Sequence, residues 1–321
     1  MALTDEGIVA VPGLASRWVR LASGAKAHYM TSGDEGPAVV LLHGGLPGSS
    51  GSAGWRFTAP FLGAHGFRVF APDMPGYGLS DPAPEHRPKG LHTQVDFIHE
   101  FVTALGLDTF HLSGNSMGCM NTVNYMLAHP EKVTSFVLIA GDIGDITEDL
   151  ERPEGPVKPA YDGTAEGMKS LMSAIIYRPG AISDDLVEMR HRASERHAAG
   201  APQYFDAMMQ YVHRNIADPN IAARLRTKGR LDKITIPGIY LYGQNDVLIP
   251  VEWGYKQETV LPNVQFFYPA ECGHQGQTDQ PDLFNQVYLE FFRDGKVSRQ
   301  SADAAGVSKH REELANLVEQ I

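Results

Sequence analysis

Short apolar runs alternate along the chain with longer amphipathic stretches. Six of these runs predict β-strands, at residues 38–42, 67–71, 109–112, 133–139, 239–242 and 264–268. Because they are apolar at consecutive positions, we expect strands that are covered on both faces. Amphipathic or apolar stretches that follow the strands predict helices at residues 94–105, 117–128 and 281–292. Strands that alternate with helices indicate an α/β fold, with a mostly parallel sheet and helices on both faces.

The alternation breaks between the fourth and fifth predicted strands. Residues 168, 171, 172, 175 and 176 are apolar and share one helical face, and residues 184–199 form a charged, helix-prone run. A helical insertion between two strands would lie over the carboxyl ends of the sheet as a cap. We therefore predict a core in two parts, a helical cap and a C-terminal tail, with these bounds: core 1–141 and 233–294, cap 142–232, tail 295–321.

The tail begins with a polar stretch and ends with a possible helix. Four apolar residues of the segment 310–321 would share a helical face: Leu314, Leu317, Val318 and Ile321. We expect a tail that is loosely docked on the core rather than a helix that binds a partner.

Composition narrows the classes of partner. The chain has 321 residues, of which 43% are hydrophobic, and a formal net charge of −11. This charge argues against nucleic acid or an anionic membrane as the partner, although a locally basic pocket could still bind a small anionic substrate. A small-molecule substrate is therefore expected, and assembly into a homodimer or a larger homo-oligomer stays open.

Cysteine usage and the N-terminal segment bear on the compartment. Cys119 and Cys272 are the two cysteines, which is too few for a disulfide framework and fits a reducing environment. The first residues have early acidic positions and do not resemble a signal peptide, and no apolar run approaches 18 residues. We expect a cytoplasmic protein in which both cysteines serve packing.

The segment HLSGNSMGCMNTV, residues 111–123, carries the first candidate for catalysis. Ser116 lies between Gly114 and Gly118 in a Gly-x-Ser-x-Gly motif, with a predicted strand before it and a predicted helix after it. Glycines leave room for a tight strand-to-helix turn, and the serine then projects above the sheet near a helix N-terminus. This context predicts that Ser116 is a nucleophile.

A serine nucleophile needs a base, and the base needs an orienting group. His274 follows the last predicted strand, and Asp246 follows the strand before it. The chain order Ser116, Asp246, His274 is that of α/β-hydrolase triads. Asp279 and Asp282 are the nearest rivals of Asp246, and we interpret both as helix-start residues.

The sequence HGGLPG after the first predicted strand is a candidate oxyanion loop. Glycines such as Gly44 let the backbone approach a ligand closely, and backbone N–H groups can face an oxyanion. We predict that Gly45, Leu46 and Met117 form the oxyanion hole. His43 is expected to hold this loop rather than to transfer protons.

These motifs together resemble the α/β-hydrolase superfamily up to about residue 293. HGGLPG, PDMPGYGLSD, GNSMG, CGH and DLFNQVYLEFF look like the meta-cleavage product hydrolases, and IIYRPGAISDDLVEMRHRAS is similar to the cap segment of that family. The resemblance implies an α/β-hydrolase fold with no cofactor. It also implies hydrolysis of a carbon–carbon bond in vinylogous 1,5-diketones formed by ring opening of catechols. It maps the arginine that binds the substrate carboxylate onto Arg190, and the asparagine beside the nucleophile onto Asn115.

Two positions depart from the usual residues of that family. Leu46 replaces the third glycine of the loop, and Gln275 replaces a tryptophan after the catalytic histidine; both positions border the substrate. A carboxylesterase or lactonase on a small carboxylate-bearing or apolar ester is therefore the alternative activity. A ligand receptor that retains a hydrolase triad is a third hypothesis, because fold alone does not determine function.

Overall fold

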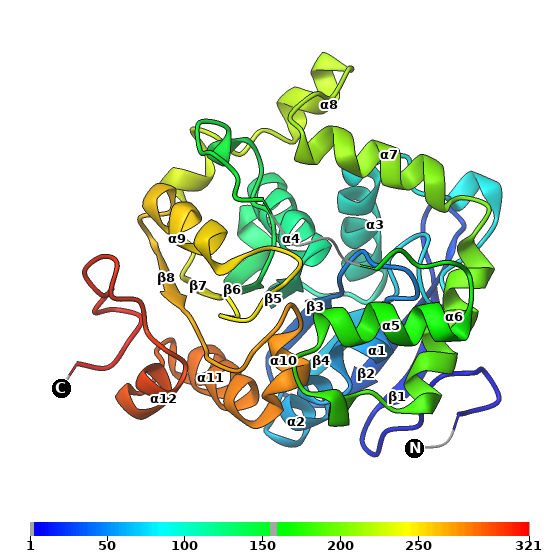
Figure 1. Ribbon diagram of the computed structural model, residues 1–321, viewed down its shortest axis with the longest axis horizontal. Coiled ribbons are helices and arrows are strands. Elements are labelled where there is room, and N and C mark those ends of the chain that lie inside the picture. The colour runs from blue at the N-terminus through cyan, green and yellow to red at the C-terminus, as the bar shows by residue number, and fades with distance from the viewer. Residues whose placement is uncertain (1–2, 155–158, 321) are drawn as a thin grey trace.

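The computed structural model describes residues 3–154 and 159–320, which form a sheet of eight strands between two layers of helices (Figure 1). The strands lie in this order across the sheet: β1 (Ala15–Arg20), β2 (Lys26–Ser32), β4 (Arg68–Pro72), β3 (Ala38–Leu42), β5 (Phe110–Asn115), β6 (Val133–Ile139), β7 (Gly238–Leu241) and β8 (Val264–Phe267). Strand β2 pairs antiparallel with β1 and β4, and all other pairs are parallel. The predicted α/β fold with a mostly parallel sheet is confirmed.

All six predicted strands are present, each within three residues of its predicted bounds. The hairpin of β1 and β2 at the sheet edge was not predicted. Strand β1 is at most half-buried, so its residues do not form the apolar run that marks a strand covered on both faces. An edge strand of this kind gives a weak sequence signal.

Strand β3 shows how the sheet divides the core. Val40 and Leu42 pack into the cluster on one face, whereas Val39 and Leu41 pack into the cluster on the other. The first face is covered by α3 (Leu91–Ala104), α4 (Met117–Ala128) and α9 (Val251–Val260). The second is covered by α1 (Gly51–Trp55), α2 (Thr58–Ala64), α10 (Gly276–Asp279), α11 (Pro281–Asp294) and α12 (Arg299–Ala304). Short 3₁₀ turns, η1 (Pro84–His86) and η2 (Pro130–Lys132), join elements of the core.

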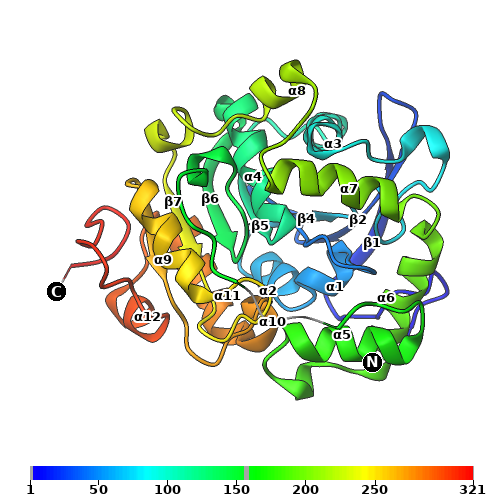
Figure 2. The ribbon, with the colours of Figure 1, turned by 45° about the horizontal axis from the view of Figure 1, so that its top comes forward.

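The described residues between 142 and 232, which we call the cap, contain helices and no strand. They form η3 (Asp145–Thr147), α5 (Ala165–Ile175), η4 (Pro179–Ala181), α6 (Asp184–His197), α7 (Ala201–Val212), α8 (Pro219–Arg224) and the start of η5 (Leu231–Lys233). Helices α5, α6 and α7 form an arch beside the sheet, and α8 projects from it (Figures 1 and 2). Thr164 and Ser183 are the N-cap residues of α5 and α6, and their hydroxyls accept backbone N–H groups of the first turn. Within the described residues, no helix is both long enough and apolar enough to span a bilayer.

The tail differs from its prediction. Its helix is α12 (Arg299–Ala304), and the described part of residues 310–321 forms turns, so the helix predicted there is wrong. Val297 N–H donates to Leu317 O at 2.9 Å and Glu319 N–H donates to Val297 O at 2.9 Å, so the backbone of this segment pairs with Val297. Leu317 and Val318 are 2% and 0% exposed. The tail is therefore packed into the core and is not loosely docked.

Candidate active site

Ser116 occupies a strained turn between β5 and α4. Its φ of 58° and ψ of −117° lie in a region that residues other than glycine rarely adopt. A Cβ at Gly114 would lie 2.0 Å from the Gly118 carbonyl oxygen, and a Cβ at Gly118 would lie 2.3 Å from that of Leu42. The turn therefore requires both glycines of the motif. Its tightness places the half-buried Ser116 at the wall of a cavity.

Asp246 and His274 form a buried hydrogen-bonded pair at the same end of the sheet. The imidazole Nδ1 lies 2.8 Å from Asp246 Oδ2, and both side chains are at most 1% exposed. A carboxylate can only accept, so Nδ1 carries the proton and donates it. This tautomer leaves a lone pair on Nε2, which is buried and has no hydrogen-bond partner among the described residues. The pair thus has the form of a general base and its orienting acid.

The amide of Asn115 connects the loop of His274 to the nucleophile turn. Asn115 Nδ2 donates to His274 O at 3.0 Å and to Ile139 O at 3.1 Å. Because Asn115 directly precedes Ser116, these bonds tie the backbone of the base to the residue beside the nucleophile. Both amide protons of Asn115 are used in this way, and the side chain is buried.

Asp279 supports the loop of His274 as well as lying in the first turn of a short helix, α10, as predicted. Its carboxylate accepts the N–H groups of Gly273 at 2.7 Å and Arg178 at 2.9 Å. The sequence did not indicate this second role, in which the carboxylate joins the His274 loop to the cap. Burial raises the pKa of Asp279. Asp282 does lie in the first turn of α11, as predicted.

The predicted oxyanion loop packs directly on the nucleophile turn. A Cβ at Gly44 would lie 3.3 Å from Ser116 Cβ, and a Cβ at Gly45 would lie 3.0 Å from Met117 Cβ. Gly45, Leu46 and Met117 line the same cavity as Ser116. Their place beside the serine agrees with the predicted oxyanion hole, which stays a prediction.

Side-chain hydrogen bonds hold the loop in place. His43 Nδ1 lies 2.7 Å from Gly44 O, and His43 Nε2 accepts the N–H of Met74 at 3.0 Å. The imidazole is therefore neutral, and burial lowers its pKa further from the usual range. His43 holds the loop, as predicted. Tyr77, which the sequence did not single out, donates its hydroxyl to Gly45 O at 2.9 Å.

Arg190 lies behind this loop on α6. It is 1% exposed, and its Nη2 donates to Pro47 O at 3.0 Å and to Ser49 Oγ at 3.4 Å. Burial, followed by the nearby charge of Arg56, lowers the pKa of Arg190 to about 10. No carboxylate among the described residues forms an ion pair with Arg190, and its buried Nε has no hydrogen-bond partner there. Burying a guanidinium without a counter-ion costs free energy, so an anion bound beside Arg190 would stabilise it.

The cavity in front of Ser116 has a volume of about 1010 Å³. Its described wall contains four arginines and two carboxylates: Arg87, Arg152, Arg196, Arg214, Asp142 and Glu148. The cavity is thus locally basic in a protein whose formal net charge is −11. Of the cap methionines, Met208 and Met209 line it, whereas Met168, Met172 and Met189 pack in the core.

The remaining predicted site residues do not belong to the described lining of the cavity. Asn115, Arg190 and Gln275 are buried behind it, as are Asp246 and His274, and Gly44 lies against Ser116. The sequence analysis missed all four arginines of the described cavity wall, because loops and cap helices bring them together without a shared motif.

Two further groups could have carried chemistry. Cys119 and Cys272 are free and buried, and burial raises the pKa of both thiols, that of Cys272 to about 12. Their predicted packing role is confirmed. Within residues 3–154 and 159–320, no three His, Cys, Asp or Glu side chains are placed to hold a metal ion.

Comparison with known proteins shows which proteins this chain is similar to. The family model for the alpha/beta hydrolase fold matches residues 37–170. A 2-hydroxy-6-oxononadienedioate/2-hydroxy-6-oxononatrienedioate hydrolase of Paraburkholderia phymatum is 28% identical over 287 residues, which cover 86% of this chain and 95% of that protein. A 2-hydroxy-6-oxo-6-phenylhexa-2,4-dienoate hydrolase of Burkholderia cepacia is 28% identical over 83% of this chain and 91% of its own.

A solved structure of a hydrolase is also similar to this chain. The meta-cleavage product hydrolase from Pseudomonas fluorescens IP01 superposes with a TM-score of 0.69 at 25% identity, over 87% of this chain and 98% of that one. These relatives favour an enzyme over the receptor hypothesis. The protein is a hydrolase with the alpha/beta-hydrolase fold, and it resembles the meta-cleavage product hydrolases.

Proposed function

We propose that the protein hydrolyses a carbon–carbon bond in a ring-fission product of the 2-hydroxy-6-oxo-dienoate type, in the degradation of aromatic or steroid compounds. The observation that carries this proposal is that Ser116 opens into a basic cavity in an acidic protein. A dienoate substrate is an anion, and such a cavity attracts it. The named activities of the relatives give the class of bond that is cleaved.

The triad supplies the nucleophile in this proposal. His274, oriented by Asp246, moves the proton that converts the dienol of the substrate to its keto form. The pair of Ser116 and His274 then delivers a nucleophile, either the serine oxygen or a water molecule, to the distal carbonyl carbon. The carbon–carbon bond next to that carbonyl breaks, and its electron pair leaves with the dienoate fragment. Where the serine oxygen has attacked, water then hydrolyses the acyl-enzyme and releases the acid. Backbone N–H groups of the oxyanion hole stabilise the intermediate, and each such donor contributes about 3–4 kcal/mol in other enzymes.

Arg190 is proposed to bind the dienoate carboxylate. Its buried, unpaired charge would gain a counter-ion, and a guanidinium can hold a carboxylate through two parallel hydrogen bonds. Because Arg190 now donates to Pro47 O, substrate binding would replace or rearrange this contact at the oxyanion loop. Asn115 stays assigned to the dienoate end of the substrate, and Gly44 and Gln275 to substrate binding, as predictions.

Bleaching of yellow ring-fission dienoates in a spectrophotometer tests the proposal. Wild-type protein should bleach them, and Arg190→Ala should lose most of this activity. Arg192→Ala is the matched control, because Arg192 lies on the same helix with a side chain 58% exposed and pairs with Glu188. Equal effects of the two substitutions would contradict the role of Arg190.

An ester hydrolase is the second candidate, and the observation that favours it is Leu46. This residue lines the cavity where the related family has a glycine, and it narrows the space beside Ser116. Rapid hydrolysis of simple esters, together with no bleaching of any dienoate tested, would establish this alternative. Under it, Arg190→Ala should change the turnover of an uncharged ester very little.

A further inference from the structure

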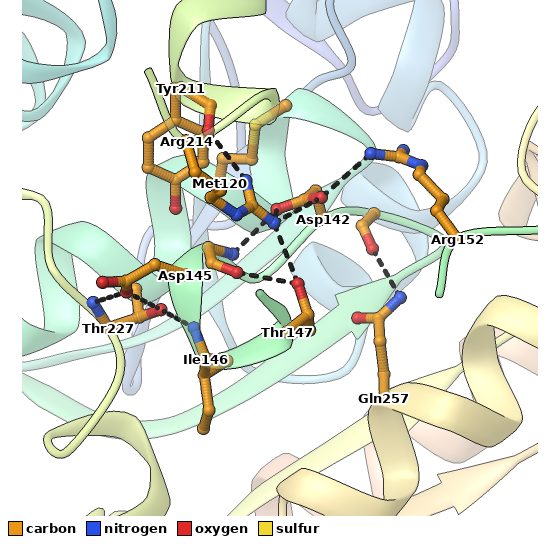
Figure 3. Close-up of polar contacts among 12 residues, drawn as sticks. Met120, Asp142, Asp145, Ile146, Thr147, Arg152, Tyr211, Arg214, Thr227 and Gln257 are labelled. Carbon is orange, nitrogen blue, oxygen red and sulfur yellow. Dashed lines mark hydrogen bonds and ion pairs between the residues drawn. The ribbon is translucent and has the colours of Figure 1, made fainter. Parts of the chain in front are cut away.

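A cluster of two arginines and one aspartate lies in the cavity wall, at a place separate from Arg190. Asp142 follows β6, and the guanidinium groups of Arg152 and Arg214 approach it from two sides (Figure 3). Arg214 Nη2 lies 2.9 Å and 3.1 Å from the two oxygens of Asp142, and Arg152 Nη1 lies 3.3 Å from Oδ2. All three residues line the cavity. One carboxylate therefore faces two guanidinium groups, which leaves a net positive charge.

Other charged groups lie near this cluster. Glu148 also lines the cavity, and its carboxylate shares the ammonium group of Lys228 with Asp149, which gives that group of three a net negative charge. Tyr211 O and Thr147 Oγ1, the other partners of Arg214, are neutral. The excess positive charge is therefore a local property of Asp142, Arg152 and Arg214, and what they can bind depends on where their donors point.

Two buried donors in this part of the wall have no acceptor among the described residues. They are Arg214 Nε and the indole Nε1 of Trp253, a cavity-lining residue that is 2% exposed. The guanidinium carbon of Arg152 lies 5.4 Å from the Trp253 ring centroid, so the three side chains are close together. Buried donors without acceptors are costly, and an anionic oxygen would satisfy them.

The backbone of Arg214 is also held in an unusual conformation. Its φ of 58° lies in the left-handed region, which long side chains rarely adopt. Hydrogen bonds to Tyr211 O, Asp142 and Thr147 hold its guanidinium in place. Strain of this kind persists where the surrounding contacts define one position for the side chain.

The sheet order places this cluster and Arg190 on opposite sides of the nucleophile. Strand β5, which ends next to Ser116, lies between β3 and β6. Arg190 contacts the loop after β3, whereas Asp142 lies in the loop after β6. Gly141 packs on the nucleophile turn, since its Cβ would lie 2.5 Å from Ser116 O. A substrate that binds Arg190 and reaches past Ser116 therefore extends toward Arg152 and Arg214.

We propose that Arg152, Arg214 and Trp253 bind a carboxylate on the ketone side of the substrate, so that the preferred substrates are acids at both ends. The inference rests on the proposed function, which places the dienoate carboxylate at Arg190. Asp142 orients the two guanidinium groups, and the donors that it leaves free face the second acid. The alternative is that the ion pairs of Asp142 only hold segments of the cap to one another.

The experiment compares two dienoates that differ in one group. The first is 2-hydroxy-6-oxonona-2,4-diene-1,9-dioate, and the second carries a neutral methyl ester at the far acid. Wild type should prefer the diacid in kcat/KM. Arg152→Gln should reduce this preference by about 10- to 100-fold, the range for loss of a charged hydrogen bond. Arg214→Gln should act in the same direction, and Arg152→Lys, which keeps the charge, should restore part of the preference.

The controls separate binding from folding. Arg152 is 40% exposed and makes a single hydrogen bond among the described residues, so its substitution should leave the melting temperature within a few degrees of wild type. Arg224→Gln removes an arginine that pairs with Asp96 outside the cavity, and it should leave the preference as in wild type. A preference that survives in both Arg152→Gln and Arg214→Gln would overturn the proposal, and so would a wild type that prefers the neutral substrate.

A pair of esters makes the result independent of carbon–carbon cleavage. In p-nitrophenyl hydrogen glutarate the acyl group carries a distal carboxylate, and in p-nitrophenyl valerate it does not. If no dienoate is bleached but the glutarate is preferred in a way that depends on Arg152, the proposed function fails and the acid subsite stands. If dienoates are bleached but neither pair shows an arginine-dependent preference, the subsite fails and the proposed function stands.

Discussion

The bond between Asp246 and His274 offers the sharpest test of the proposed catalytic residues. The second oxygen of Asp246, Oδ1, accepts the N–H groups of Leu248 at 2.8 Å and Ile249 at 2.9 Å. In Asp246→Asn these two donors would hold the amide oxygen at the same place. The NH₂ group would then face His274 Nδ1, which must become an acceptor. The ring proton would move to Nε2, and the imidazole could no longer take a proton from Ser116.

The size of the effect follows from this reversed tautomer. The same substitution in a serine protease lowers kcat by about 10⁴-fold, and each factor of ten corresponds to about 1.4 kcal/mol. Asp246→Asn should therefore raise the barrier by about 5 kcal/mol. Its fold should be intact, because the new side chain has the same size and keeps its backbone contacts.

Stopped-flow bleaching of a dienoate measures kcat. If dienoates are not substrates, hydrolysis of a p-nitrophenyl ester measures it instead. Thermal unfolding checks that the variant is folded. Asp279→Asn is the matched control, because this carboxylate is also buried near His274 but accepts backbone N–H groups, those of Gly273 and Arg178 among them, instead of the imidazole. It should lower the free energy of unfolding by about 1–3 kcal/mol, with a far smaller loss of kcat. A loss below tenfold in Asp246→Asn, or an equal loss in Asp279→Asn, would refute the reasoning.

Three predictions concern the fold. Gly114→Ala should lower the free energy of unfolding in urea by more than about 2 kcal/mol, since the new Cβ would lie 2.0 Å from a carbonyl oxygen; an undiminished value would contradict the strained turn. Burial lowers the pKa of His111 from 6.5 to about 4. As the pH falls, His111 is therefore protonated in the unfolded chain before it is protonated in the folded protein. The resulting stability, up to about 3 kcal/mol, is present above pH 6.5 and lost toward pH 4, and His111→Gln should flatten the dependence of the melting temperature on pH in this window. Leu317→Ala should cost about 2–5 kcal/mol, whereas exposed Glu319→Ala should cost almost nothing; equal effects would show that the tail is not part of the folded unit.

The features that the sequence predicted correctly depend on local pattern. Strands β3 and β6 and helix α4 have their predicted bounds, because runs of apolar residues and the strand-turn-helix of the serine motif are properties of neighbouring residues. The structure also pairs Asp246 with His274, whereas the role of Ser116 as their nucleophile stays a prediction. The helix predicted at 310–321 failed for a related reason, since periodicity alone does not show that Val297 binds this segment through its backbone.

The sequence by itself determined the α/β core, the turn that carries Ser116 and the identity of the candidate base and acid. Only the tertiary structure decided how the loops around them are joined: Asn115 bonds to the backbone of His274, Tyr77 to the oxyanion loop, and Asp279 to the cap. Only the tertiary structure also gathered Arg152 and Arg214 around Asp142, residues that lie far apart along the chain and share no motif. Hydrogen bonds and ion pairs depend on distances in space, and side chains from separate segments come within that distance only when the sheet orders its strands and the cap closes over their ends.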